Sequence, residues 1–186
     1  MVKKEELIKL RRQDWIDHGF KVLAERGVEA VRVEPLANLL NVTKGSFYWH
    51  FKNREELLEA ILQEWVSRET NSIIQQVEET GDDASTKLLH LLELAVQDDG
   101  RVENAIRAWA TSDPKAAVIL AQVDRHRLNY TRDLFLQVGF TSFEAIVRAR
   151  MAYYSLIGSF AVGFQIDRVE RLTEARLQHA ILTYRD

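Results

Sequence analysis

Apolar residues recur every three or four positions over most of this chain, the spacing that places them on one face of an α-helix. The first such run covers residues 5–26, where Leu10, Trp15, Ile16 and Phe20 alternate with Lys, Arg and Asp residues. No stretch shows the strict apolar–polar alternation of a half-buried strand over a convincing length. The pattern predicts an all-α protein of about nine helices.

Turn and capping residues divide this pattern into separate helices. Asn41 tolerates a left-handed conformation, and Thr43 offers a hydroxyl to cap the helix that follows. Asn53 precedes Glu56 by three residues, as in a capping box, and Pro114 suits the first turn of a helix. We expect helices over about residues 5–26, 33–40, 44–51, 54–79, 84–97, 101–110, 114–138, 143–165 and 170–184.

The short helices expected at residues 33–40 and 44–51 are separated by a turn of three to four residues. A longer helix precedes them and can support both. This is the helix-turn-helix plan, in which the second short helix reads DNA.

The second short helix combines buried anchors with groups suited to nucleic acid. Phe47 and Phe51 are four residues apart, so we expect them in the core against the first helix. Thr43 and Lys44 begin the helix, where free N–H groups favour phosphate and side chains reach base edges. Gly45 costs a helix about 1 kcal/mol relative to Ala, and its missing side chain permits close approach of the backbone to DNA.

Composition and charge narrow the class of protein. The 186 residues are 46% apolar and 28% charged, and none is Cys, which excludes disulfides and fits a cytoplasmic protein. The most apolar segment, 153–166, is too short to span a bilayer, so no membrane partner is expected. Residues 1–55 hold eleven Lys and Arg against eight Asp and Glu, a net of +3, whereas residues 56–186 hold fourteen against twenty, a net of −6. This polarity is typical of a nucleic-acid-binding domain on an acidic body.

Signs of catalysis are not found in the sequence. The five His residues show no metal-ligand spacing, and the nearest constellation, Asp124 and His126 with His90 far upstream, is a poor transition-metal set. No Gly-rich phosphate loop, nucleophile elbow or pair of catalytic carboxylates stands out. We therefore expect no metal, no cofactor and no enzyme activity.

One set of residues in the N-terminal third forms a specific pattern: Gly27, Val33, Leu36, Ala37, Val42–Tyr48, His50, Phe51 and Lys52–Leu58. This pattern resembles the DNA-binding domain of the tetracycline-repressor (TetR) family. Arg32 stands where the family more often has a capping Thr or Ser, Asn41 replaces a frequent Gly, and Trp49 replaces a smaller or polar residue. Arg32 and Trp49 leave the operator sequence open.

The resemblance implies a helix-turn-helix DNA-binding domain over residues 1–52 and a helical ligand-binding and dimerisation domain over residues 53–186. It implies DNA contacts by Tyr48, His50 and Lys52, and Trp49 is a candidate for contact with a thymine methyl group or a sugar. The DNA-facing set we expect is Arg32, Thr43, Lys44, Gly45, Ser46, Tyr48, Trp49, His50 and Lys52. The alternatives are that Tyr48 is partly core, that His50 caps the helix end, and that Arg32 and Lys52 are solvated surface charges.

In the larger domain, polar and aromatic groups among apolar helical positions are candidates for a ligand pocket. They are Trp109, His126, Tyr130, Tyr153, Tyr154 and Phe164, and each taken singly could instead be an ordinary core residue. The last two helices carry small residues, such as Ala145, Ala149 and Ala152. The resemblance implies that these helices form a four-helix bundle with those of a second subunit.

The sequence thus predicts a homodimeric transcriptional repressor that binds a palindromic operator in double-stranded DNA and is released by a small-molecule effector. Two alternatives of the same fold are a regulator that needs no effector and an activator. An enzyme built on a helical bundle would require a reactive site that the sequence does not offer.

Overall fold

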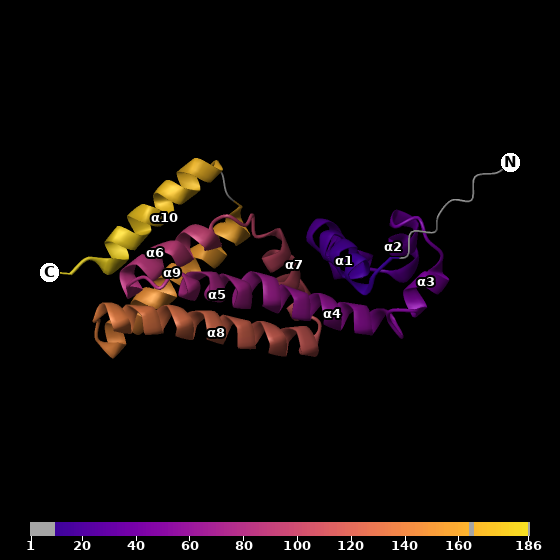
Figure 1. Cartoon of the computed structure of the whole chain (residues 1–186), viewed down its shortest axis with the longest axis horizontal. Coiled ribbons are helices and arrows are strands. Elements are labelled where there is room, and N and C mark those ends of the chain that lie inside the picture. Colours follow the sequence, from indigo (N-terminus) through magenta and orange to yellow (C-terminus); the bar gives the residue numbers. More distant parts are fainter. Residues whose placement is uncertain (1–9, 164–165, 186) are drawn as a thin grey trace. The chain divides into compact units, whose positions relative to one another are not determined.

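A computed structural model describes residues 10–163 and 166–185, and within these ranges the regular elements are helices (Figure 1). The all-α prediction is confirmed for this part of the chain. Contacts divide the chain into two compact units, one ending at Glu64 and the other beginning at Trp65. The boundary falls within helix α4 (Arg54–Val66), which was expected to belong wholly to the second domain.

The first unit is a small helical cluster built around buried aromatic and aliphatic side chains. It contains α1 (Arg12–Arg26), the 3₁₀ turn η1 (Val28–Ala30), α2 (Val33–Leu39), α3 (Lys44–Tyr48) and most of α4. Its fully buried side chains are Trp15, Leu23, Val31, Leu36, Phe47, Leu57 and Ile61. The Phe47 ring meets the Trp15 ring edge-on, with centroids 5.3 Å apart, so α3 is anchored on α1 as its apolar spacing predicted.

The turn between α2 and α3 has the backbone that the sequence requires, although one expected cap does not form. Asn41 takes a positive φ of 53°, and the Val42 N–H donates to the Ala37 carbonyl at 3.0 Å. Thr43 is the N-cap residue of α3, but its side chain accepts no capping hydrogen bond. The Ser46 N–H donates to the backbone carbonyl of Thr43 instead, at 3.0 Å, so the turn is closed by the main chain and the predicted hydroxyl cap is wrong.

Arg54 ties the start of α4 to the rest of the first unit. Its Nε donates to the Val31 carbonyl at 2.6 Å and its Nη2 to the Val28 carbonyl at 2.7 Å. Hydrogen bonds from a charged donor are stronger than neutral ones. The frame that carries α3 is therefore held by polar contacts as well as by its core.

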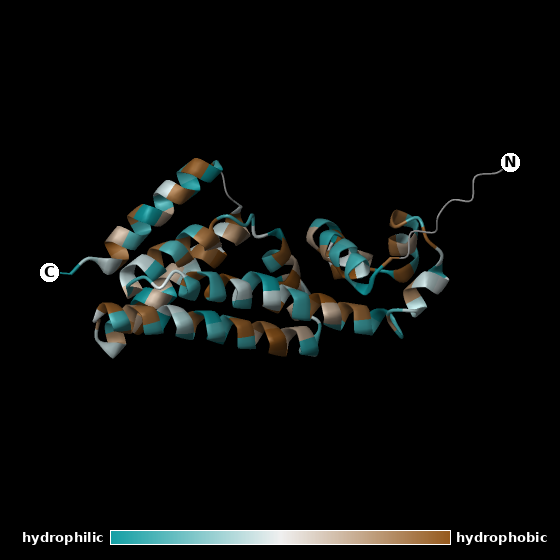
Figure 2. Cartoon of the chain, viewed as in Figure 1, coloured by the Kyte–Doolittle hydropathy of each residue, from teal (hydrophilic) through white to brown (hydrophobic). Residues whose placement is uncertain are grey.

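The second unit is a bundle in which α8 is the central helix. Its elements after α4 are α5 (Ser72–Glu79), α6 (Ala84–Ala95), α7 (Arg101–Ala110), α8 (Pro114–Val138), α9 (Ser142–Val162) and α10 (Arg168–Thr183). Helix α8 packs against α6, α7 and α9, and α10 packs mainly on α6. Side chains of Asp83, Asp113, Thr141 and Asp167 cap α6, α8, α9 and α10. Polar and apolar residues alternate along these helices, as the periodicity predicted (Figure 2).

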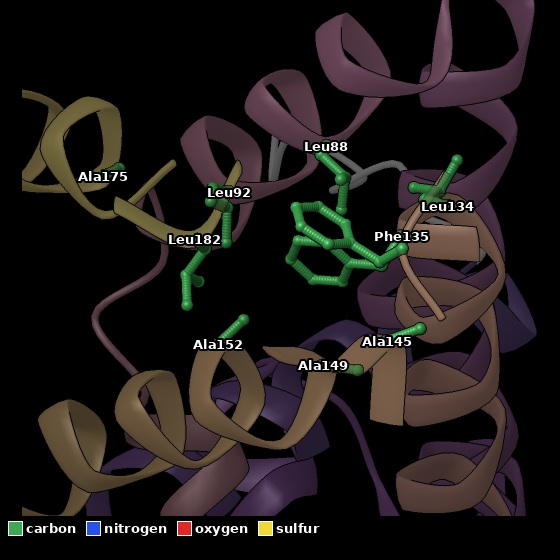
Figure 3. Close-up of a cluster of buried hydrophobic side chains, with 10 residues drawn as sticks. Leu88, Leu92, Leu134, Phe135, Ala145, Ala149, Ala152, Ala175 and Leu182 are labelled. Carbon is green, nitrogen blue, oxygen red and sulfur yellow. The ribbon is translucent and has the colours of Figure 1, made fainter. Parts of the chain in front are cut away.

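Alanines of α9 let the central helices approach closely. Ala145, Ala149 and Ala152 are buried in one cluster with Phe135 and Leu182 (Figure 3). These small residues face the interior of this chain, because a side chain as small as a methyl group fits where α9 crosses its neighbours. The expected pairing of α9 and α10 with a second subunit stays a prediction.

One turn between α4 and α5 departs from the long helix expected over residues 54–79. Residues Ser67–Asn71 form a π-helical turn, η2, and Thr70 within it is buried. Arg127 of α8 donates from Nε to the Thr70 hydroxyl and from Nη2 to the Glu69 carbonyl, both at 2.9 Å. These contacts stabilise the wider turn, and π-turns of this kind are frequent at functional sites.

Candidate functional site

Helix α3 buries one face completely and presents the other to solvent. Phe47 is fully buried, whereas the next two residues, Tyr48 and Trp49, are 60% and 87% exposed. Phe51 is buried and its ring stacks on Phe47 at 5.3 Å. Large exposed aromatic side chains next to a polar surface mark interaction sites more often than scattered apolar residues do.

Neither packing nor backbone conformation requires a glycine at position 45 of α3. A Cβ built on Gly45 would meet only the Thr43 hydroxyl, at 3.5 Å, which is an ordinary contact. Gly45 is also absent from the residues with positive φ. Glycine weakens a helix by about 1 kcal/mol relative to Ala, and neither packing nor backbone conformation requires it at this exposed position.

The cationic side chains on this side of the unit are held by their neighbours. Lys44 Nζ lies 2.8 Å from the Glu34 carboxylate of α2, and both side chains are more than half exposed. Arg32 donates from Nε to the Glu29 carbonyl at 2.8 Å. An exposed ion pair contributes at most about 1 kcal/mol, so Lys44 can exchange Glu34 for another anion at little cost.

The other expected contact residues lie on the same short stretch. Ser46 and His50 are half-buried, and Thr43 and Lys52 are exposed. The Lys52 N–H donates to the Glu56 carboxylate at 2.7 Å, and the Glu56 N–H donates to Asn53 Oδ1 at 2.9 Å. The predicted side-chain cap by Asn53 is confirmed, whereas the carboxylate of Glu56 accepts from the N–H of Lys52 rather than from that of Asn53, so the reciprocal bond of a capping box is displaced by one residue.

The second unit holds a cavity of about 700 Å³, a size suited to a small organic ligand. Its walls come from η2, α5, α6, α8, α9 and α10, and Tyr130 and Tyr153 are the predicted residues that line it. Trp109 is buried in the core, while His126 and Tyr154 are exposed, so these three lie elsewhere. Tyr153 and Tyr154 are neighbours on one helix and therefore point in different directions. Phe164 lies outside the described residues.

A partly buried ion network adjoins the cavity through Glu103, Arg127 and Tyr153, which line it. Arg127 Nη1 lies 2.9 Å from one oxygen of Glu103, and Arg107 Nη2 lies 2.8 Å from the other. Arg107 also pairs with Asp124 at 2.6 Å, and the Tyr153 hydroxyl donates to the same carboxylate at 2.6 Å. Burial, together with the hydrogen bond to Asp124, raises the pKa of the Tyr153 phenol, which keeps it a neutral donor.

Glu69 and Asp98 add a second pair of carboxyl groups to the cavity wall. Burial raises the pKa of the Glu69 carboxyl to about 7, and the neighbouring Asp98 and Glu103 act in the same direction, while Arg127 opposes them. Two carboxylates in one partly buried place disfavour each other's charge. Nearby cations therefore compensate the negative charge at this end of the cavity only in part.

Three cavity residues, Glu69, Thr70 and Arg127, were not predicted from the sequence. The signal for the first two was the polar run Ser67–Asn71, which separates Trp65 from the next apolar pair of the helical pattern, Ile73 and Ile74. Arg127 gave no such signal, because charged residues are common on an amphipathic helix. Among the described residues, no group of three or more His, Cys, Asp or Glu could hold a metal ion, and no helix is long and apolar enough to cross a membrane.

Known proteins resemble both units. Residues 16–61 match the family of bacterial regulatory proteins described as the tetR family. The chain is 30% identical over 97 residues to the transcriptional regulator AcrR of Shigella flexneri. The alignment covers 48% of this chain and 44% of that protein. It is 32% identical over 62 residues to the class D tetracycline repressor protein of Escherichia coli, covering 33% of this chain and 28% of the repressor. The matches thus span less than half the length of these relatives.

The fold of the whole chain is also shared with solved structures. A TetR-family transcriptional regulator from Streptomyces coelicolor superposes with a TM-score of 0.79 over 92% of this chain and 87% of that one, at 14% identity. The family match lies within the first unit, and the structural match covers both units. Residues 16–61 therefore carry the N-terminal domain of the tetR family of bacterial regulatory proteins, and the chain shares the fold of solved TetR-family regulators.

Proposed function

We propose that this protein is a cytoplasmic transcriptional repressor that binds a palindromic operator as a homodimer and is released by a small-molecule effector. The exposed side of α3 is its DNA-reading surface. Repression is supported by the relatives, since one of them is named a tetracycline repressor. The larger unit pairs the two subunits and binds the effector.

The contrast within α3 is the observation that carries the proposal. One short helix buries Phe47 completely and leaves Tyr48 and Trp49 largely exposed, with Lys44 and Gly45 beside them. A recognition helix needs anchors on one side and base-reading or phosphate-binding groups on the other. Gly45 gives the DNA backbone room to approach, and its lack of an internal role supports this reading.

The apolar faces of α9 and α10 support a dimer. Residues Phe143, Val147, Met151 and Tyr154 follow helical spacing on α9 and are all exposed, as are Leu177 and Ile181 on α10. Exposed apolar stripes on neighbouring helices are typical of protein–protein interfaces. An isologous pairing of two copies through these faces would present two α3 helices to a two-fold symmetric site.

The effector acts through the π-turn in this proposal. Arg127 holds η2 while also lining the cavity, and η2 continues the helix that begins as α4 in the DNA-reading unit. A ligand that prefers one arrangement of η2 changes the position of α4 and hence the spacing of the two reading helices. Couplings of this kind are typically about 1–3 kcal/mol. A regulator without an effector is the alternative, and it would bind operator equally well with the cavity filled or empty.

Two substitutions on α3 test the DNA-binding claim. Lys44→Ala and Tyr48→Phe should each weaken binding to a selected palindrome, Lys44→Ala by about tenfold or more with a salt dependence lower by about one charge. Lys21→Ala, an exposed lysine on α1, is the matched control and should change affinity little. If both α3 variants fold, dimerise and bind as tightly as the wild type, α3 does not read DNA.

A further inference from the structure

The cavity of the second unit has apolar walls and a charged end. Ile73 and Ile74 of α5, Leu91 of α6 and Leu156 of α9 are among the apolar wall residues, and Trp65 and Phe160 add aromatic surface. The volume of about 700 Å³ leaves room for a ligand with a substantial apolar body. The charged groups along the wall determine which charge the polar part of that ligand can carry.

The arginine deepest in this wall is already used by the protein. Arg127 is largely buried and makes three polar contacts, to the Glu103 carboxylate, the Thr70 hydroxyl and the Glu69 carbonyl, each at 2.9 Å. Its guanidinium also lies 5.3 Å from the centroid of the Trp65 ring. An anionic ligand could recruit Arg127 only by breaking contacts that hold η2, and leaving Glu103 short of a partner in a buried site is costly.

The cavity wall carries more carboxyl groups than guanidinium groups. Those of Glu69, Asp98, Glu103 and Glu174 line the cavity against the guanidinium groups of Arg68, Arg127 and Arg171. Glu103 is matched by Arg127 and Arg107. Arg171 donates from Nη1 to the backbone carbonyl of Asp98 at 2.9 Å, and one oxygen of the Asp98 carboxyl accepts from the Gly100 N–H at 2.6 Å.

Glu69 is the carboxyl whose charge the free protein opposes most. It lies on the π-turn with its backbone carbonyl held by Arg127, while its side chain is in hydrogen-bonding contact with the carboxyl group of Asp98. Burial and this contact raise the pKa of Glu69, so the pair favours holding a proton. A positive charge beside the two side chains would replace that proton, and apolar walls would strengthen the attraction by excluding water.

We propose that the cavity binds an organic cation, an amine or onium compound with an apolar body, whose charged centre lies beside the paired carboxyl groups of Glu69 and Asp98. The apolar body occupies the space between α5, α6, α9 and α10. The inference rests on the proposed function only in taking this cavity as the effector site. It names the class of effector and the two side chains that select it.

Matched pairs of ions of opposite charge test the proposal on the purified full chain without DNA. Tetraphenylphosphonium and tetraphenylborate have the same shape, and decyltrimethylammonium and decanoate offer an extended apolar chain. Isothermal titration calorimetry, below the micelle concentration of the chain compounds, should give at least about tenfold tighter binding for the cation of at least one pair. An uncompensated buried charge changes affinity by at least this factor.

Variants then locate the charged centre. Glu69→Gln and Asp98→Asn keep the size of each side chain, and the amide oxygen introduced by Asp98→Asn can still accept from the Gly100 N–H. Each should weaken cation binding about tenfold or more and leave the thermal unfolding midpoint near that of the wild type. Glu79→Gln, an exposed acid at the end of α5 outside the cavity, is the matched control and should change affinity less than about twofold.

The proposal is overturned if neither cation binds, if the anions bind as tightly as the cations, or if Glu69→Gln and Asp98→Asn bind like the control. DNA binding is measured separately on a selected palindrome. Cation binding without any DNA binding would contradict the proposed function and leave the cavity inference standing. DNA binding without selective cation binding would contradict the cavity inference and leave the proposed function standing.

Discussion

The candidate binding groups of the first unit face solvent, whereas those of the second unit face its interior. In the first unit Lys44, Tyr48 and Trp49 point outward from a helix whose buried side consists of phenylalanines. In the second unit Arg127 and Glu103 point inward, and α9 and α10 expose large apolar side chains such as Phe143 and Ile181. The outward set suits a rigid partner that approaches from solvent, such as DNA. The inward set suits a small molecule that must be enclosed.

This difference also separates what each charge does for the protein. An exposed cation such as Lys44 contributes little to folding, because water screens it and Glu34 is a weak partner. A buried cation such as Arg127 contributes to the fold. Removing it would take away one ion-pair partner of Glu103 and the donor that the Thr70 hydroxyl accepts from. Removing one cation from each unit should therefore have opposite consequences for stability and for binding.

Arg127→Met gives the largest expected effect. The substitution keeps an extended apolar stem but removes the three contacts to Glu103, Thr70 and the Glu69 carbonyl, so we expect a loss of about 3 kcal/mol in the free energy of unfolding. Urea unfolding followed by circular dichroism measures it. Arg125→Met, an exposed neighbour on α8, should cost under about 0.5 kcal/mol. Equal stabilities of the two variants would mean that the buried network does not support the fold.

Gly45→Ala should separate folding from binding in the first unit. The added methyl group has room inside the protein, so the free energy of unfolding should stay constant or rise by up to about 1 kcal/mol. Affinity for operator should fall about tenfold, because the methyl group occupies space that DNA needs. Gly158→Ala on α9, where a Cβ meets nothing within 4 Å, should stabilise similarly without changing operator affinity. Unchanged DNA binding by Gly45→Ala would remove the argument that this glycine serves DNA.

Glu34→Gln should produce the smallest change, and in the direction of tighter binding. The substitution frees Lys44 from its 2.8 Å ion pair and removes a negative charge beside α3. Operator affinity should rise about two- to fivefold, and stability should change by less than about 1 kcal/mol. Fluorescence anisotropy at low salt measures the affinity, with Glu25→Gln at the exposed end of α1 as the control. A decrease in affinity would show that Glu34 helps to place Lys44 rather than competing for it.

The first unit could be predicted from the sequence in most of its detail. The apolar spacing that buried Phe47 and Phe51, the positive φ of Asn41 and the side-chain cap by Asn53 are all local properties of neighbouring residues. Thr43 shows the limit of local reasoning. Its position at the start of α3 was predicted, whereas its hydroxyl makes no cap, because a rotatable side chain has other staggered positions that a sequence does not distinguish.

The second unit could be predicted as helices but not as a site. Its cavity joins residues such as Glu69, Arg127 and Tyr153, which lie far apart in the chain and meet only through packing. Periodicity also left open which of two adjacent tyrosines faces inward, and the structure selects Tyr153. Alanines at 145 and 149 indicated close helix packing, and the structure places them against other helices of the same chain.

The central claim, that the exposed side of α3 reads DNA, is tested most directly by selection of binding sites from random duplex DNA by the wild-type protein and by Lys44→Ala. We expect the wild type to enrich a palindrome whose half-sites lie about one helical turn apart (~34–36 Å), and we expect Lys44→Ala to bind it more weakly. Enrichment of no sequence, or of a sequence without two-fold symmetry, would contradict the account.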